Sequence, residues 1–464
     1  MIPQGGREER MMTMIHWKTR KKRLLALVCA LVLILGCAGC SDKKSDAGNG
    51  SNAENKTPSP TIPVTGTPTP EPTAEPTAAP NGKTKELTTS SGKAAEGKPM
   101  DDVMKKAYEA FAYNLFRETG DGNRMVSPFS IYAAFGMLAN GADNETLAQI
   151  NNVLGLKEDE RNAYFEYWTG MLTKKREKGP EFTCANSVWI LDEIAKFVPK
   201  TFLDKVSDSY RAAVFSSPFD AAAVTELNRW VEANTKGMIK KLIDKFPPDL
   251  TMVLLNAISF EANWEVQFEE DGIQKNFTFT REDGTKTKVD MMFGEANGIY
   301  LHNSLATGFI KNYEGGEFKY LALLPNEGVT VKQLVASLEP GTIADLIKDA
   351  YHGEVTIGMP KYEAEYECSL VKTMQALGMK DVFEIERADL TRMIDVPNSN
   401  SYVAEVLHKT FISVDAKGTK AAAATGIFVA TESVAIGYNV TLDRPFVYMI
   451  LDANNLPIFL GTYE

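Results

Sequence analysis

A run of small side chains near the end of the sequence most constrains what this chain can fold into. It spans residues 413–433, and from Thr419 onward its residues fall into two alternating sets. In an extended strand, alternate side chains point to opposite faces, so each set would lie on one face. The first set is uncharged and consists of small or β-branched residues: Thr419, Ala421, Ala423, Thr425, Ile427 and Val429. Such a strand can slide between two existing strands without burying an ion, while Lys420 stays on the other face.

The same segment also fits an alanine-rich helix. Alanine is the best helix former, and four alanines stand in a row at 421–424. Gly418, Gly426 and the β-branched residues after Thr425 disfavour a long helix. The segment alone therefore leaves both conformations open.

Short motifs along the rest of the chain narrow the interpretation. Each is weak by itself, but together they follow one order: Met125–Ile131, Gly141–Ala142 with Thr146, Ala185–Trp189, Asn228–Ile239, Leu254–Trp264, Met291–Met292, Leu324–Pro325, Met359–Tyr362, Leu377–Met379, Val406–Lys409 and Arg444–Phe446. In this order they resemble the serpin family, and the resemblance covers roughly residues 100–464.

The resemblance implies a fold and a mechanism. The implied fold is α+β, with a large central sheet, two smaller sheets, about nine helices and an exposed reactive loop at residues 413–433. The implied function is inhibition of a serine endopeptidase, which cuts the loop as a substrate and forms an acyl-enzyme. The cut loop then inserts into the central sheet as an extra strand and traps the protease. The expected partner is thus a serine protease in a covalent acyl complex, and the inhibitor is expected to be a monomer without cofactor, metal or enzymatic activity.

Periodicity independently predicts a mixture of helices and strands. Apolar residues at helical spacing predict helices over residues 101–116, 145–154, 225–245 and 367–379. Apolar runs predict strands over residues 253–260, 320–324, 355–359, 440–442 and 446–451. Pro325 and Pro360 mark the ends of two of these strands. This mixed order favours an α+β domain.

Within the resemblance, the loop begins with a hinge and contains the bond that the protease cuts. The expected hinge residues are Ala416, Lys417, Gly418, Thr419, Lys420, Ala421, Ala422, Ala423 and Ala424. Counting inclusively from Ala416, the seventeenth residue is Glu432, which makes Glu432–Ser433 the expected reactive bond and a glutamyl-specific protease the expected target. Thr431–Glu432 and Val434–Ala435 are alternatives, because their small residues suit an elastase-like protease. Ala416 and Lys420 depart from the family, which commonly carries glutamate there.

Further residues match family positions that govern the opening of the sheet: Ser127, Ser130, Asn256, Trp264 and His408. The resemblance implies that His408 lies beneath the central sheet, hydrogen-bonded near Ser127, Ser130 and Asn256. It also implies that Trp264 lies at the top of the sheet, where the loop first inserts. From the residues alone, His408 could instead serve catalysis, and Trp264 could be an ordinary core aromatic.

Composition and missing motifs exclude several other functions. The formal net charge of -11 disfavours a nucleic-acid partner. Signature motifs of serine hydrolases, zinc proteases, nucleotide-binding loops and dinucleotide folds do not occur. A lipid-anchored solute-binding protein, a surface hydrolase and a non-inhibitory serpin remain as alternatives. The ordered motifs and the alanine-rich hinge count against the first, the missing nucleophile motifs count against the second, and the small, uncharged inserting face counts against the third.

The first part of the chain resembles a bacterial lipoprotein leader. A basic region ends at Arg23, and a short apolar run from Leu24 to Gly36 follows it, which predicts a signal peptide over residues 1–40. Cys37 or Cys40 would carry the lipid and hold the protein at the extracellular face of the membrane; otherwise the protein would be secreted. Residues 41–98 are rich in proline, threonine and serine and poor in large apolar residues, which predicts a disordered linker before a domain at 99–464.

Two cysteines follow the leader, Cys184 and Cys368. The domain therefore does not depend on a disulfide framework, and the sequence leaves open whether these two residues pair.

Overall fold

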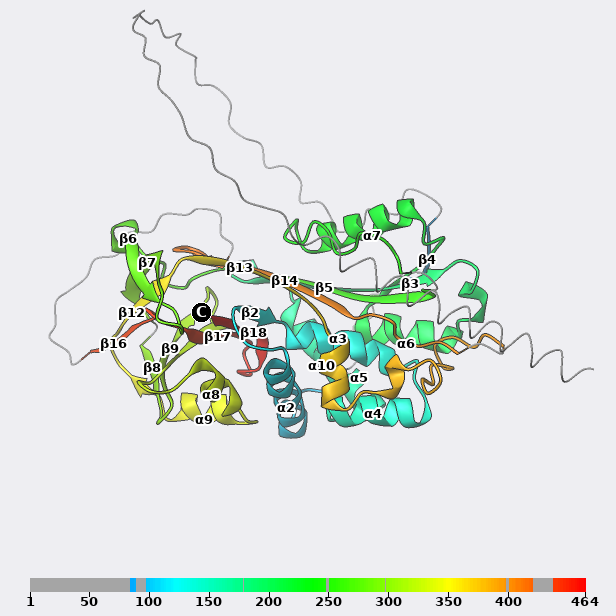
Figure 1. The fold of residues 1–464 in the computed structure, drawn as a ribbon, viewed down its shortest axis with the longest axis horizontal. Coiled ribbons are helices and arrows are strands. Elements are labelled where there is room, and N and C mark those ends of the chain that lie inside the picture. Colours follow the sequence, from blue (N-terminus) through cyan, green and yellow to red (C-terminus); the bar gives the residue numbers. More distant parts are fainter. Residues whose placement is uncertain are drawn as a thin grey trace, which may run out of the picture. The chain divides into compact units, whose positions relative to one another are not determined.

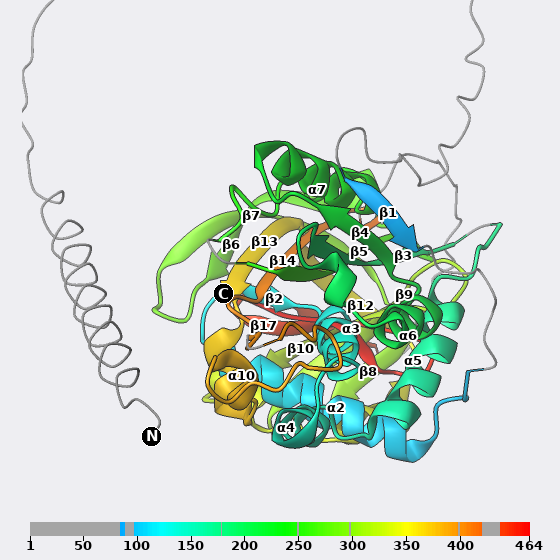
Figure 2. The same ribbon diagram turned by 90° about the vertical axis from the view of Figure 1, so that its right-hand side faces the viewer.

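The central sheet has seven strands, in the order β1-β4-β3-β5-β15-β14-β13 (Figure 2). A computed structural model describes residues 84–88, 97–177, 179–247, 250–296, 298–397, 400–419 and 437–464. In that order the strands are Lys85–Thr88, Ala213–Ser217, Glu181–Leu191, Met252–Asn263, Gly418–Thr419, Leu407–Val414 and Tyr362–Ser369. The short strand β15 is antiparallel to both of its long neighbours, β5 and β14. Among the described residues, β15 alone joins β5 to β14 in the sheet.

Two further sheets complete the β-structure. One has seven strands in the order β11-β8-β9-β10-β17-β18-β2, namely Tyr351–His352, Ile299–His302, Ala306–Asn312, Lys319–Pro325, Phe446–Leu451, Pro457–Tyr463 and Arg124–Val126. The other has four strands in the order β16-β12-β7-β6, namely Tyr438–Thr441, Val355–Pro360, Lys286–Glu295 and Ile273–Thr280. The second sheet, which contains β17 and β18, packs beneath one end of the central sheet (Figure 1). The four-stranded sheet lies at the margin of the domain, at that same end (Figure 1).

Helices cover both faces of the central sheet. The described residues contain nine α-helices: α2 Asp102–Glu118, α3 Pro128–Ala139, α4 Asn144–Leu154, α5 Glu158–Leu172, α6 Lys200–Tyr210, α7 Ala221–Asn234, α8 Val331–Ala336, α9 Thr342–Lys348 and α10 Val371–Leu377. Short 3-10 turns lie at Ala195–Phe197, Glu270–Gly272 and Asp381–Phe383. Helix α7 lies alone on the outer face, whereas α3, α5 and α6 lie on the inner face (Figure 1). None of the helices in these residues is long and apolar enough to cross a membrane.

Helix α3 occupies the centre of the fold. Its side chains are buried almost throughout, and it packs against β5 of the central sheet and β18 of the second sheet. Ser127 caps its N-terminus by accepting a hydrogen bond from the backbone N–H of Ser130, and Pro128 occupies the first turn, where it breaks no helical hydrogen bond. The start of α3 is held to the central sheet by a hydrogen bond from the backbone N–H of Ser127 to His408 on β14.

The α+β class and most of the predicted elements are confirmed. Helices α2 and α4 and strands β5, β10, β12 and β17 lie where periodicity predicts them, and β10 and β12 end at the expected prolines. The second sheet equals the central sheet in strand number, so only the third is smaller. The strand predicted at 440–442 is β16, which begins earlier, at Tyr438.

Two predicted helices were too long. Helix α7 ends at Asn234 rather than at residue 245, because Thr235 turns its hydroxyl back to the carbonyl of Val231 and Gly237 adopts a positive φ of 76°. The helix predicted at 367–379 begins only at Val371, since the preceding residues continue strand β13 as far as Ser369.

Strand β1 forms inside the predicted linker. Residues Lys85–Thr88 pair antiparallel with β4 at the edge of the central sheet, and the hydroxyl of Thr84 donates to that of Ser217 over 3.2 Å. Lys85, Glu86 and Leu87 remain exposed, so backbone pairing rather than apolar burial holds this strand. Composition therefore gave no signal for it. The signal peptide and the linker residues 41–83 and 89–96, and with them Cys37 and Cys40, lie outside the described residues.

Candidate functional site

The candidate site is the turn that carries the chain from β14 into β15. One carboxylate oxygen of Asp415 accepts hydrogen bonds from the backbone N–H groups of Lys417 and Gly418, over 2.9 and 3.1 Å. The backbone N–H of Asp415 donates to the carbonyl of Gly418 over 2.9 Å. A Cβ atom on Gly418 would lie 2.0 Å from the carbonyl oxygen of Ala262, so only glycine fits so close to β5.

Two neighbouring buried aromatic residues hold this turn by hydrogen bonds. The backbone N–H of Trp264 donates to the carbonyl of Lys417 over 2.8 Å, and that of Phe268 donates to the carbonyl of Ala416 over 2.9 Å. The indole Nε1 of Trp264 donates to the carbonyl of Asp415 over 2.9 Å. Trp264 therefore lies at the top of the sheet, against the start of the loop.

Thr419 points into the core of the protein. Its side chain is only 2 % exposed, and its hydroxyl shares a hydrogen bond of 2.7 Å with the hydroxyl of Tyr313. Tyr313 stacks on the indole of Trp264 with ring centroids 4.5 Å apart. Burial raises the pKa of Tyr313, so its phenol stays neutral. The set of alternating residues that begins at Thr419 thus starts on the inward face of the sheet.

His408 lies on β14 beneath the sheet and contacts the start of α3. Its Nε2 accepts a hydrogen bond of 3.1 Å from the backbone N–H of Ser127, whose hydroxyl donates to the carbonyl of Ile458. Burial lowers the pKa of His408 to about 4, so the ring is neutral at physiological pH. Because the ring is buried and its Nε2 already accepts a hydrogen bond from a backbone amide, His408 has a structural role, which argues against its acting as a catalytic base.

Asn256 makes different contacts from those expected. Its side-chain amide donates to the side-chain oxygen of Asn186 over 2.6 Å and to the sulfur of Cys184 over 3.4 Å. It therefore links β5 to β3, whereas His408 contacts α3 from β14. The expected place of Asn256 was near His408, but no hydrogen bond joins these two side chains among the described residues. Asn186 was not singled out, although it lies within the motif Ala185–Trp189.

The remaining predicted site residues lie beyond the described part of the chain. These are the later hinge residues from Lys420 to Ala424 and the residues around the reactive bond, Thr431, Glu432, Ser433, Val434 and Ala435. The structure therefore describes the first hinge residues, Ala416 to Thr419, and the strand that follows the loop, β16.

Metal-binding groups and reactive thiols were sought among the described residues. No group of histidine, cysteine and acidic side chains there could hold a metal ion. Cys184 and Cys368 are both free thiols, and burial raises the pKa of Cys184 to about 12, so it is no ready nucleophile.

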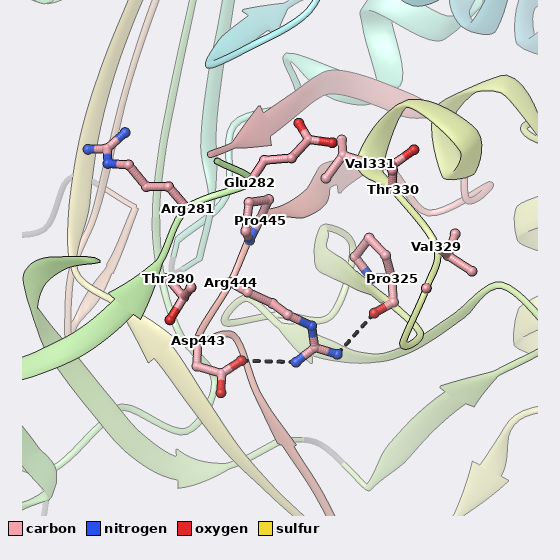
Figure 3. A pocket seen from close by; sticks show the side chains of 11 residues that line it. Thr280, Arg281, Glu282, Pro325, Val329, Thr330, Val331, Asp443, Arg444 and Pro445 are labelled. Carbon is pink, nitrogen blue, oxygen red and sulfur yellow. Dashed lines mark hydrogen bonds and ion pairs between the residues drawn. The ribbon is translucent and has the colours of Figure 1, made fainter. Parts of the chain in front are cut away.

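A pocket of about 520 Å³ opens between the β6–β7 turn, the end of β10 and residues 443–445 (Figure 3). Its most central cation is already engaged, because the guanidinium of Arg444 contacts Asp443 and the carbonyl of Pro325, each over 3.0 Å. Arg281, at the rim, donates to the carbonyl of Glu464. These contacts join two motifs noted in the sequence, Leu324–Pro325 and Arg444–Phe446, and give the arginine a structural role.

Two features together define the architecture of one protein class. The central sheet carries a loop hinge between two of its long strands, and a buried histidine holds a helix beneath it. The family model described as serpin (serine protease inhibitor) matches residues 106–464, and the chain belongs to the serpin family. It is 31% identical to neuroserpin of Gallus gallus over 359 residues, which covers 73% of this chain and 85% of the relative.

Solved structures agree with this assignment. The native state of the thermophilic serpin tengpin matches with a TM-score of 0.73 and 34% identity, over 82% of this chain and 99% of that one. Human thyroxine-binding globulin in complex with its hormone matches with a TM-score of 0.70 and 26% identity, over 77% of this chain and 97% of that one. Serpins generally act on serine proteases as inhibitors rather than as catalysts and are generally secreted, although some of them bind hormones.

Proposed function

We propose that this protein inhibits a serine endopeptidase as a suicide substrate, through a loop cut at or near Glu432–Ser433. One observation carries the proposal: β15 pairs with β5 through Gly418 and Thr419 and with β14 through Thr419, at the top of the gap that an inserted loop would fill. Lys420 belongs to the other alternating set, and the alanines 421–424 that follow it are small, so the strand can lengthen in the same register without displacing the core.

The register of β15 predicts the partners of the inserted strand. Thr419 lies opposite Ala262 on β5 and Val414 on β14. Continued in the same antiparallel register, Ala421 would lie between Phe260 and Ile412, and Thr425 between Asn256 and His408. The inserting strand would then lie between Asn256 on β5 and His408 on β14. Asn256 offers a side-chain oxygen that has no hydrogen-bond partner among the described residues.

The mechanism follows from competition between two rates. The serine of the protease would attack the carbonyl of Glu432, form an ester with it, and release Ser433 as a new amino terminus. Each residue that then joins the sheet adds backbone hydrogen bonds worth about 0.5–1.5 kcal/mol each. Insertion must outrun hydrolysis of the ester, and the run of alanines after Thr419 keeps side-chain rearrangement small.

Lys420, which departs from the family, suits the charges on the outer face of the sheet. Its row in the inserted strand would contain Glu261 on β5 and Ser413 on β14, flanked by Glu181 and Glu363. Lys236 already contacts both Glu181 and Glu261 from the α7 side, over 2.5 and 3.1 Å. A lysine added to this row meets three carboxylates, whereas a glutamate would meet like charges.

Replacing Lys420 by glutamate is therefore expected to weaken inhibition. A like charge in this row slows insertion, so more protease molecules escape for each one trapped. We expect the stoichiometry of inhibition to rise by about two- to fivefold at low salt, because an exposed charge pair contributes about 0.2–1 kcal/mol. Titration of a fixed amount of protease with increasing amounts of the inhibitor measures this stoichiometry. Lys420→Gln is the matched control and should change it less; equal effects of both variants, or an effect independent of salt, would contradict the charge argument.

The target and the location are proposed from the sequence. The bond Glu432–Ser433 indicates a glutamyl-specific protease, whereas Thr431–Glu432 or Val434–Ala435 would suit an elastase-like enzyme, because a carboxylate is unfavourable in an apolar pocket. We further propose that residues 1–40 export the protein and that Cys37 or Cys40 anchors it by a lipid to the extracellular face of the membrane. Labelled palmitate incorporated into the wild type, but lost from Cys37→Ser or Cys40→Ser, would identify the anchor.

A protease panel tests the inhibitory function. Incubation with elastase-like and glutamyl-specific serine proteases should give a covalent complex that survives boiling in detergent. Cleavage of the loop with full recovery of protease activity at every ratio would favour a non-inhibitory serpin. Complete absence of cleavage, together with saturable binding of a small molecule, would favour the solute-binding alternative.

A further inference from the structure

A lysine is buried just beneath the turn that carries the loop hinge. Lys311, on β9, is 0% exposed, and its ammonium donates to the backbone carbonyl of Glu295 over 2.9 Å. Lysine is rarely buried, because an ammonium loses its hydration there and regains little from one carbonyl. The inhibitory mechanism proposed above does not use this residue.

Aromatic rings surround the buried ammonium. Its nitrogen lies 4.5 Å from the ring centroid of Phe268 and 5.7 Å from that of Trp264. Tyr320 lies directly opposite Lys311 in the register of β9 and β10, so its side chain shares the same face. The ring faces attract the cation, but they replace its water only in part.

Two of these aromatic residues also hold the hinge. Trp264 and Phe268 donate their backbone N–H groups to the carbonyls of Lys417 and Ala416, and the indole of Trp264 donates to that of Asp415. Lys311 therefore contacts the rings of the same two residues whose backbone N–H groups hold the hinge.

The ionisable groups around Lys311 come from several elements. From β7, Glu295 offers its carbonyl to Lys311 while its own side chain is exposed. From the segment after β5, the exposed Glu265 accepts from Asn312 over 3.0 Å. From the hinge, Asp415 uses its carboxylate on backbone N–H groups, and from β10, Tyr320 shares its hydroxyl hydrogen bond with Tyr362.

Burial sets the protonation of Lys311. It lowers the pKa of this amine to about 7, although the carboxylates of Glu295 and Glu265 act in the opposite direction. At neutral pH the buried lysine is thus poised between its charged and neutral forms.

We propose that Lys311 is a positioning residue for the loop hinge, and that gain of a proton on Lys311 loosens the hold of Trp264 and Phe268 on residues 415–417. Departure of the hinge removes part of the cover over Trp264 and Phe268 and lets water approach the ammonium. The charged lysine therefore favours the form in which residues 415–417 have left Trp264 and Phe268, called here the hinge-out form. The neutral lysine favours the hinge-in form, in which these residues stay in place. The effect on protease trapping depends on the proposed inhibitory function, whereas the hinge equilibrium itself does not.

The sign of the pH dependence follows from linkage. The amine has the lower pKa with the hinge in place and a higher one with the hinge out, so the hinge-out form binds more protons near neutral pH. Raising the pH through about 7 therefore strengthens the hold on the hinge. A difference of one pKa unit between the two forms corresponds to about a tenfold change in the hinge equilibrium.

Hydrogen exchange on the full-length protein, without any protease, tests this proposal. The backbone amides of Trp264 and Phe268 lose their acceptors when the hinge leaves, and mass spectrometry of peptides covering residues 263–268 reads them. After correction for intrinsic exchange, their protection in the wild type should rise about tenfold between pH 6 and pH 8.5. Lys311→Met keeps an apolar side chain among the rings and should hold high protection at every pH. Lys348→Met, at an exposed lysine that ends α9, is the control and should behave as the wild type does.

Lys311→Arg adds a variant that stays charged throughout this range and should show low protection at both pH values. Flat protection in the wild type, or a pH profile in Lys311→Met equal to that of the wild type, would overturn the proposal. If Lys311→Met does not fold, the wild-type profile and Lys311→Arg still decide it. A missing covalent complex with normal pH-dependent protection would refute the inhibitory function alone, which keeps the two failures distinct.

Discussion

Replacing Thr419 by arginine is expected to turn the protein from an inhibitor of its target protease into a substrate. Thr419 is 2 % exposed and hydrogen-bonds Tyr313 in the core, so an arginine there would bury an unpaired guanidinium. If this raises the barrier to insertion by about 3 kcal/mol, insertion slows by more than about a hundredfold. Hydrolysis of the acyl-enzyme is then faster than insertion of the loop, so the protease is released. Gel analysis should show cleaved protein in place of covalent complex, and the stoichiometry of inhibition should rise steeply.

Thr419→Val is the matched control for this variant. It keeps the size and branching of threonine and removes only the hydroxyl that contacts Tyr313, which contributes about 0.5–1.5 kcal/mol. We expect it to trap protease with a modest loss of efficiency. If Thr419→Arg trapped protease with the wild-type stoichiometry, the loop would not insert at this position and the assignment of the hinge would be wrong.

Cleavage of the loop is expected to raise the thermal stability of the protein strongly. Once cut, residues after Thr419 can complete the sheet between β5 and β14, and about ten new backbone hydrogen bonds contribute roughly 10 kcal/mol. For a domain of this size, such a gain corresponds to a rise in Tm of more than about 10 °C. Differential scanning calorimetry of the intact and the cleanly nicked protein measures the difference.

The nicked Thr419→Arg variant provides the control, because its loop is cut but inserts poorly. It should gain much less stability than the nicked wild type. An unchanged Tm after clean cleavage between Phe428 and Val434 would identify a non-inhibitory serpin, even if all other features of the fold are retained.

The sequence predicted elements whose stability comes from apolar burial. Strand β17, Phe446–Leu451, is a continuous apolar run and is buried along its whole length, so its bounds agree with the prediction. Strand β1 was missed because it is held to β4 by backbone hydrogen bonds with exposed side chains. Helix α7 was extended too far, since the polar turn at Thr235 and Gly237 interrupts an apolar pattern that continues beyond it.

In the candidate site too, the sequence predicted some features and missed others. Alternation in the sequence placed Thr419 on an uncharged face, and in the structure that side chain points inward; its role in insertion stays a prediction. The partners that surround the hinge were not predicted. Tyr313 and Lys311 lie near the end of β9, in another sheet, and an isolated antiparallel bridge between Trp264 and Tyr313 holds that end beside the segment after β5. No local spacing could indicate such contacts, because more than a hundred residues separate Tyr313 from Thr419.

The mass of the small C-terminal fragment released on denaturing the covalent complex shows which bond the protease cuts and whether the loop has trapped it. Suicide inhibition with insertion requires that the protease remain esterified to a loop long enough to span the sheet. We expect a detergent-stable complex and a fragment that begins at Ser433, or at Glu432 or Ala435 if the protease is elastase-like. A fragment that begins upstream of Phe428, or cleavage without any covalent complex across the protease panel, would contradict it, because too little loop would remain to carry the protease along the sheet.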